Sequence, residues 1–254
     1  MNTFTRSLLF TAMAAVGLTQ GCSCSDDDDD PVVITPPPEA TVAVSGKAAK
    51  GLVLNGIVEA CPVTPAGINC DTPYATATTD DTTGSYTLNV PEVNATGPFA
   101  IRVSAGENST MKCDLPDGCG DADFGEPVAL DLDFELDALV PQATANSTVN
   151  LSMLTHAASE SALRSLQEGD SIAARIAEAE SGLLGSLGIL GVTDLKQVPV
   201  VDLTNPDEVA AADASTLNFN LFGPAIVSAG RQGSTVPSIA TAIKNFARQY
   251  ADAG

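Results

Sequence analysis

The chain has 254 residues, with 32 acidic and 11 basic side chains, and its formal net charge at pH 7 is −21. This charge argues against nucleic acid as a partner, because binding to phosphate needs a basic surface. Hydrophobic residues make up 44% of the chain, which favours a folded protein over a disordered one. Aromatic residues make up only 4%, which argues against carbohydrate or single-strand binding by ring stacking.

Residues 1–21 have the pattern of an export signal. Arg6 precedes an apolar run over residues 8–18, which is shorter than the roughly 20 residues that a membrane-spanning helix needs. Gly21 followed by Cys22 resembles the lipobox of bacterial lipoproteins, in which the signal is cut before a cysteine that then carries the lipid. The resemblance implies lipidation of Cys22 and anchoring in a membrane by more than one acyl chain. An ordinary secretory signal with an incidental cysteine is the alternative.

Residues 22–40 predict a solvated tether. Five adjacent carboxylates at 26–30 repel one another, and three prolines at 36–38 favour extended backbone. A calcium site in the acidic run is the weaker alternative, because adjacent carboxylates without a turn make a poor oxygen cage. Ser23 after the lipidated position resembles lipoproteins that are sent to the outer membrane. Either the periplasmic or the outer face of that membrane fits the sequence.

Residues 41–151 have the pattern of a small β domain. Short runs rich in β-formers alternate with turns, and polar and apolar residues alternate within them over 85–90 and 131–137. Seven or eight short strands at this spacing predict an antiparallel β-sandwich. The predicted strands are Thr41–Ser45, Leu52–Ala60, Tyr74–Thr78, Ser85–Val90, Phe99–Ser104, Pro127–Asp131, Phe134–Val140 and Thr148–Leu151.

About 60 residues of this region resemble the carboxypeptidase-regulatory-like, or prealbumin-like, β-sandwich. The matching positions are turn and core residues: Val44-Ser45-Gly46, Gly51, Asn55-Gly56-Ile57-Val58, Thr78-Thr79-Asp80 and Gly84-Ser85-Tyr86-Thr87-Leu88. The resemblance implies a transthyretin/Ig-like sandwich in a protein outside the cytoplasm. It implies a structural or binding unit and no catalysis.

Four cysteines of the β region form two close pairs. Cys61 and Cys70 enclose one turn-rich loop, and Cys113 and Cys119 enclose another. An exported chain in an oxidising compartment favours disulfides at 61–70 and 113–119, although four cysteines allow three connectivities. A zinc site is disfavoured, because the spacings exceed CxxC and the chain has one histidine. The role of Cys24 stays open.

An acidic loop follows Cys113. Asp117, Asp121 and Asp123 are weak candidates for Ca²⁺ ligands, because carboxylates in a disulfide-closed loop can surround a hard cation. Their spacing lacks the alternate positions of an EF-hand loop. A solvated acidic loop without a metal is the other interpretation.

Residues 152–254 predict a helical domain. Apolar residues recur at helical spacing over 154–166, 172–187 and 236–250, and Asn205-Pro206 is a helix start. Asp170 or Ser171 is the expected cap of the second helix, which the glycines at 182–191 weaken or end. Four or so amphipathic helices predict a small bundle.

The junction at 149–158 resembles a short element of bacterial surface lipoproteins in which a β-sandwich precedes an alanine-rich helical region. In such proteins this pair often begins a longer chain, so a complete protein and a longer one both fit. His156 lies in this junction, and we expect it to be packed and hydrogen-bonded rather than catalytic. No G-x-S-x-G, H-E-x-x-H, P-loop or dinucleotide motif is present.

These patterns predict an α+β protein, with a small antiparallel β-sandwich followed by a helical bundle. The expected function is that of a non-catalytic, lipid-anchored envelope protein that acts as a structural or binding module on the bacterial surface. The membrane is its expected partner through the lipid, and an unidentified protein is the second. The alternative is a calcium-dependent binding protein, or an accessory part of a larger extracellular enzyme or adhesin.

Overall fold

The computed structural model describes residues 39–230 and 238–253. Residues Glu39–Gly254 form one compact unit. The predicted boundary at residue 151 falls where the strands end and the helices begin, yet both segments belong to this unit. Among the described residues, none of the helices has the length and apolar character that crossing a membrane requires. Cys22 and the tether lie outside the described residues.

Strands form three sheets on the N-terminal side of the unit. In the first sheet, β1 pairs with β6, β11 and β12. In the second sheet, β7 lies between β10 and β3, and β3 also pairs with β4 and β5. The third sheet has the order β2-β8-β9. The strands are β1 (Thr41–Ala49), β2 (Val53–Leu54), β3 (Ile57–Thr64), β4 (Gly67–Ile68), β5 (Ala75–Thr78), β6 (Ser85–Pro91), β7 (Phe99–Ser104), β8 (Thr110–Lys112), β9 (Pro127–Ala129), β10 (Glu135–Val140), β11 (Ser147–Thr148) and β12 (Leu151–Ser152).

Helices occupy the rest of the unit. They are α1 (Glu92–Ala95), α2 (Met153–Arg164), α3 (Ile172–Leu187), the short 3-10 helix η1 (Leu195–Gln197), α4 (Pro206–Ala211), α5 (Ala214–Gly230) and α6 (Ile239–Ala253). A capping box between Ser152 and Thr155 begins α2, and Ser171 caps α3. Gly188, with a left-handed backbone, ends α3, and Asn205 caps α4 ahead of Pro206, as its sequence predicts.

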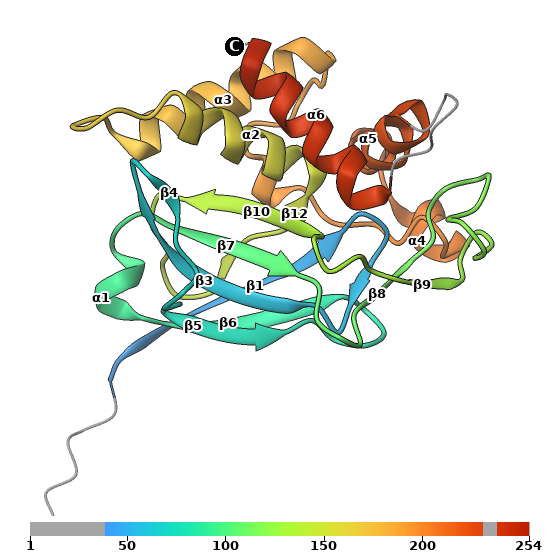
Figure 1. The fold of residues 1–254 in the computed structure, drawn as a ribbon, viewed down its shortest axis with the longest axis horizontal. Coiled ribbons are helices and arrows are strands. Elements are labelled where there is room, and N and C mark those ends of the chain that lie inside the picture. The colour runs from blue at the N-terminus through green and yellow to red at the C-terminus, as the bar shows by residue number, and fades with distance from the viewer. Residues whose placement is uncertain (1–38, 231–237, 254) are drawn as a thin grey trace, which may run out of the picture. The chain divides into compact units, whose positions relative to one another are not determined.

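The second sheet is covered on both faces. Ile101 and Val103 of β7 and Leu136 of β10 belong to the core that this sheet shares with β1 and β6. Ala100 and Leu139, on the opposite face, belong to a second core with α2 and α3. Figure 1 shows the same layers, with α2, α3 and α6 above β10 and β7 and with β1 and β6 below. Because helices cover this face of the sheet, polar residues that point toward them are buried as well.

The predicted strand Leu52–Ala60 is wrong in one respect, because the structure breaks it into β2 and β3. Asn55 has a left-handed backbone with φ of 55°. A Cβ on Gly56 would lie 2.8 Å from Val53, so this position requires glycine. The turn lets β2 pair with β8 while β3 pairs with β7.

The predicted strand Thr148–Leu151 is also corrected. It forms two short strands, β11 and β12, which pair with β1 in parallel rather than antiparallel. The buried Asn150 lies between them, and its side chain accepts the backbone N–H of Lys47 at 2.9 Å and donates to the carbonyl of Val198 at 3.0 Å. The side chain therefore satisfies backbone groups where the ladder is interrupted.

The helical prediction omits α5. This helix contains Pro224 and apolar residues on all sides, so it has no single apolar stripe to identify it. The last predicted stripe corresponds to α6, although Val236 lies outside the described residues. The glycines at 182 and 185 lie within α3 and do not end it.

Candidate functional site

A row of charged residues crosses the helix-facing surface of the second sheet. In the antiparallel register Glu59 of β3 lies opposite Arg102 of β7, which lies opposite Asp137 of β10. The side chains of cross-strand partners lie on the same face of a sheet. The residues next to them along each strand, such as Ile101 and Leu136, point into the core on the opposite face. The charged row therefore lies on the face that α2 covers. We call Arg102, Glu135, Asp137 and His156 the charged cluster.

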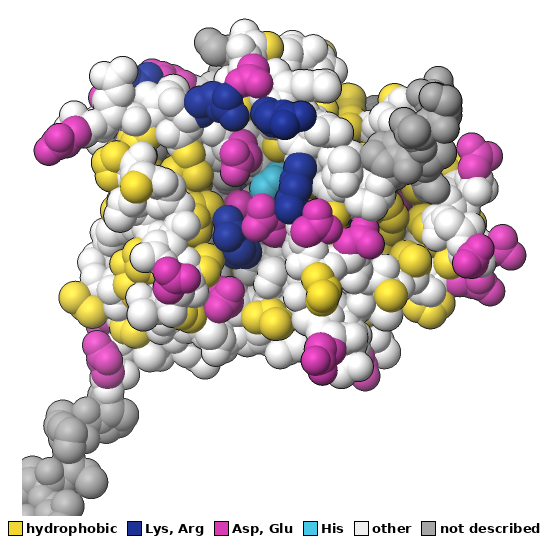
Figure 2. All heavy atoms as spheres, in the orientation of Figure 1, with side chains coloured by type: hydrophobic (Ala, Val, Ile, Leu, Met, Phe, Trp, Pro, Cys, Tyr) yellow, Lys and Arg dark blue, Asp and Glu magenta, His cyan; other side chains and the backbone are white. Residues whose placement is uncertain are grey.

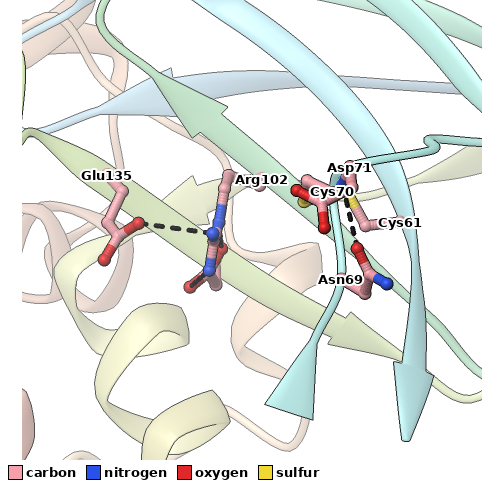
Figure 3. Close-up of a disulfide and its surroundings, with 7 residues drawn as sticks. Cys61, Asn69, Cys70, Asp71, Arg102 and Glu135 are labelled. Atoms are coloured by element: carbon pink, nitrogen blue, oxygen red, sulfur yellow. Dashed lines mark hydrogen bonds and ion pairs between the residues drawn. A yellow bond between two sulfur atoms is a disulfide. The ribbon is translucent and has the colours of Figure 1, made fainter.

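Arg102 binds Asp137 through two contacts. Its Nε donates to Oδ1 at 2.7 Å and its Nη2 to Oδ2 at 3.1 Å, and Nη1 lies 3.4 Å from Oε2 of Glu135. Figure 3 shows the contact with Glu135 and the disulfide that joins Cys61 of the neighbouring strand β3 to Cys70. The Asp137 side chain is 1% exposed, whereas that of Arg102 is 23% exposed. Two-point binding between guanidinium and carboxylate gives a well-oriented ion pair.

His156 approaches Asp137 from α2. Its Nδ1 lies 3.3 Å from Oδ2 of Asp137. The geometry is that of an ion pair and not of a hydrogen bond, so Nδ1 has no hydrogen-bond partner among the described residues. The expectation of a packed histidine at the junction is confirmed, and the expected hydrogen bond is not formed at Nδ1. Figure 2 shows a small area of histidine between acidic and basic side chains on this face.

The charges of the cluster set its protonation. Burial lowers the pKa of His156, because it disfavours the imidazolium, but the Asp137 carboxylate outweighs burial, and the pKa is raised above 6.5. Burial raises the pKa of Asp137, but His156 and Arg102 outweigh it, and the pKa is lowered. Glu160, one turn after His156, also raises the pKa of the histidine. The arrangement favours an imidazolium beside a carboxylate.

The cluster has parts of a metal site. Asp137, His156 and Glu160 offer ligand atoms within 4.8 Å of one another, and carboxylates with imidazole are ligands of divalent metals. However, the Arg102 guanidinium contacts both oxygens of Asp137. The guanidinium already neutralises this carboxylate, and its positive charge repels a metal ion there. The geometry therefore favours an internal ion-pair network.

The same geometry bears on catalysis. A histidine that acts as a base for a hydroxyl or thiol nucleophile lies within hydrogen-bonding distance of it. In the described part of the chain, Nδ1 of His156 pairs with neither kind of group. Ser159, one turn away, donates to the backbone of Thr155 and accepts from that of Leu139. Its hydroxyl therefore serves the backbone of α2 and β10.

Both predicted disulfides are present. Cys61–Cys70 joins β3 to the segment after β4, and Cys113–Cys119 closes the loop after β8. Glu59 lies near the first disulfide, and the three residues form the second group of potential metal ligands. The two sulfurs are bonded to each other and are not thiolates, so this group lacks the donors that a soft metal needs.

The predicted calcium ligands do not converge. Asp117, Asp121 and Asp123 are all exposed, and none belongs to a potential metal-binding group among the described residues. The backbone N–H of Asp123 instead binds Glu126 at 3.0 Å. The structure therefore presents these carboxylates separately along the acidic loop.

A shallow groove adjoins the charged cluster. It has a volume of about 320 Å³ and is lined by the hairpin at residues 65–68 and by Arg102, Glu160 and Arg164. Arg164 also contacts Asp252 of α6. Figure 2 shows several basic side chains on this face, over α2 and α6. Acidic side chains lie among these basic ones on the same face.

Sequence reasoning did not select Arg102 and Asp137. The alternation over 131–137 predicts one wet face, but α2 covers that face at Asp137, which is 0% exposed. The sequence held one signal for this pair: Asp137 lies in a run of residues that favour β-strands, and the single histidine, His156, follows in a predicted helix. No protein-family model, curated protein or solved structure matches this chain.

Proposed function

We propose that the chain is a non-catalytic, lipid-anchored envelope protein, and that residues 39–254 form a structural or binding module. The observation that carries this proposal is the pair of short-range disulfides in one compact unit. Disulfides persist in oxidising compartments outside the cytoplasm. This agrees with the export signal at 1–21 and with the lipobox resemblance at Gly21-Cys22.

The state of the ionisable groups supports a non-catalytic role. Arg102, Asp137 and His156 engage one another under α2, where they connect the sheet to the helix. Catalytic groups need a reacting partner within reach, whereas these groups are occupied by their neighbours. The charged cluster is best explained as an internal brace.

We further propose that the sheets form a sandwich of the carboxypeptidase-regulatory-like type. The core shared by β1 and β6 with β3, β7 and β10 supports this assignment. Gly46, Gly84 and Tyr86, which carry the resemblance, lie on or beside β1 and β6. The parallel strands β11 and β12 are additions to the antiparallel pattern that the resemblance implies.

The charge of the protein restricts its partners. A net charge of −21 disfavours nucleic acid and anionic lipid surfaces. We propose a protein or another cationic species as the partner, with the membrane contact made through the lipid on Cys22. The outer membrane is the proposed location.

Membrane fractionation with protease treatment of intact cells tests the proposal. Wild-type protein should be found in the membrane fraction, and Cys22→Ala should release it. Cys24→Ala is the matched control, because it removes a neighbouring thiol and leaves the lipobox intact. Degradation by external protease places the module on the surface, and protection places it in the periplasm. A Cys22→Ala protein that stays in the membrane fraction would refute lipid anchoring.

Calcium-dependent binding at Asp117, Asp121 and Asp123 is the alternative function. A specific ligand raises the melting temperature of the native state that it binds. We expect Ca²⁺ to leave the melting temperature unchanged in wild type and in Asp121→Ala/Asp123→Ala. An increase in wild type that is lost in the double variant would establish the alternative.

A further inference from the structure

Lys50 and Asp114 meet in the interior of the unit, away from the charged cluster. Lys50 lies in the turn after β1, and Asp114 follows Cys113 in the loop after β8. The Nζ of Lys50 contacts Oδ1 of Asp114, and the two side chains are 0% and 3% exposed. The two residues are 64 positions apart, so a bond between them would link distant parts of the chain.

The surroundings hold the two groups in place. The backbone N–H of Gly51 donates to Oδ2 of Asp114 at 2.8 Å. On the other side α5 packs over the lysine, and a Cβ on Gly223 would lie 3.6 Å from its Cδ. The Cys113–Cys119 disulfide begins at the residue before Asp114 and restrains its loop. The amine and the carboxyl group are thus fixed in contact.

Burial changes the chemistry of this pair. Removing an ammonium and a carboxylate from water is costly, and their mutual attraction does little more than offset that cost. Attack by the amine requires the loss of one ammonium proton, and Oδ1 of Asp114, in contact with Nζ, is placed to receive it. A neutral lysine amine is a nucleophile, and exclusion of water removes the competing hydrolysis.

We propose that Lys50 and Asp114 form an intramolecular isopeptide bond. The Nζ lone pair of Lys50 attacks Cγ of Asp114, and the N–H of Gly51 stabilises the negative charge that develops on Oδ2. Oδ1 leaves as water after it takes two protons from the former ammonium group. The products are one amide between Nζ and Cγ and one water molecule, so atoms and charges balance without an oxidant or a cofactor.

The site has room for the water that leaves. A cavity of about 30 Å³ adjoins the pair and is lined by Lys50, Asp114 and Asp202. This volume holds about one water molecule.

The other buried lysine differs in its surroundings. Nζ of Lys196 contacts Glu180 and lies 2.9 Å from Asp194, so two carboxylates surround it. The side chain of Lys112, paired with Asp202, is 29% exposed and keeps contact with water. Lys196–Glu180, a second buried lysine–carboxylate contact, therefore offers a matched control.

Peptide mass mapping of the full-length protein tests the bond. After reduction, alkylation and trypsin digestion, wild type should yield a branched peptide that joins the Lys50 peptide to the peptide beginning at Cys113. Its mass should be that of the two linear peptides less one water. Linear peptides alone, with cleavage after Lys50, would overturn the proposal. This result needs no variant, so it does not depend on whether a variant folds.

Variants assign the bonded atoms. Lys50→Arg and Asp114→Ala should lack the branched peptide, and Glu180→Gln should retain it. Asp114→Asn should yield the same branched peptide, because the amide keeps the reactive carbonyl and releases ammonia instead of water. A branched peptide in Asp114→Ala would contradict attack on this carboxyl group. The test is independent of lipidation, so its failure leaves the proposed function unaffected.

Discussion

Arg102 and Asp137 are cross-strand partners on β7 and β10, and the guanidinium contacts both oxygens of the buried carboxylate. His156 of α2 lies 3.3 Å from the same carboxylate. One acidic side chain thus joins two strands to the helix that covers them. A substitution of Asp137 removes the counter-charge of Arg102 and of His156 at once. It should therefore lower the stability of the protein more than a substitution elsewhere in the charged cluster.

Asp137→Asn should lower the free energy of unfolding by about 3 kcal/mol or more, because it leaves the partly buried Arg102 and the buried His156 without their carboxylate. Urea denaturation measures the change. Glu135→Gln is the control and should cost less than about 1 kcal/mol, since Glu135 is 33% exposed and lies 3.4 Å from Arg102. Equal effects of the two substitutions would contradict the assigned role of Asp137.

The raised pKa of His156 predicts how stability depends on pH. A group whose pKa is higher in the folded state contributes stability that is complete below its unfolded pKa, here about 6.5, and is lost as pH rises through the folded value. Wild type should therefore lose stability above about pH 6.5 relative to His156→Gln. Denaturant unfolding at a series of pH values measures the difference. A difference that does not vary with pH would show that the imidazolium does not stabilise the fold.

The lowered pKa of Asp202 predicts the opposite dependence. Burial raises this pKa, but the hydrogen bonds from Lys112 and Thr204 outweigh it. The stability that ionised Asp202 contributes is present above its unfolded pKa, about 3.8, and is lost as pH falls through the lower folded value. Asp202→Asn should be less stable than wild type at neutral pH, and the gap should narrow in acid. Parallel curves in the acid range would rule this out.

Gly46→Ala should destabilise the protein by about 3 kcal/mol or more. A Cβ at this position would lie 1.8 Å from the backbone oxygen of Val149, which also accepts the hydroxyl of Tyr86. β1 would have to separate from the segment between β11 and β12. Gly97→Ala is the matched control, since nothing lies within 4 Å of its Cβ. Thermal unfolding of both variants distinguishes the crowded position from the open one.

Each disulfide should stabilise the unit by about 2–3 kcal/mol, because both close short loops in the unfolded chain. Replacing Cys61 and Cys70 together by Ala should lower the denaturation midpoint, and reductant should then lower it further through Cys113–Cys119. Equilibrium unfolding with and without reductant measures both steps. An unchanged midpoint in the double variant would contradict a stabilising role of the first bridge.

Local sequence determined much of this protein. The pairs Cys61–Cys70 and Cys113–Cys119 close loops whose ends cannot separate far, so proximity along the chain predicted both bonds. The strand Phe99–Ser104 and the capped start at Asn205 also follow from neighbouring residues, because alternation and capping act over a few positions.

Tertiary structure alone decided the contacts that define the interior. Asp137 belongs to an alternating run and would face water, had α2 not covered its side of the sheet. Lys50 and Asp114 are 64 positions apart, and their contact depends on the turn after β1 and on α5 above it. Strand register and helix packing bring such pairs together through the summed burial of many side chains. That sum is a property of the whole chain, so no local pattern reports it.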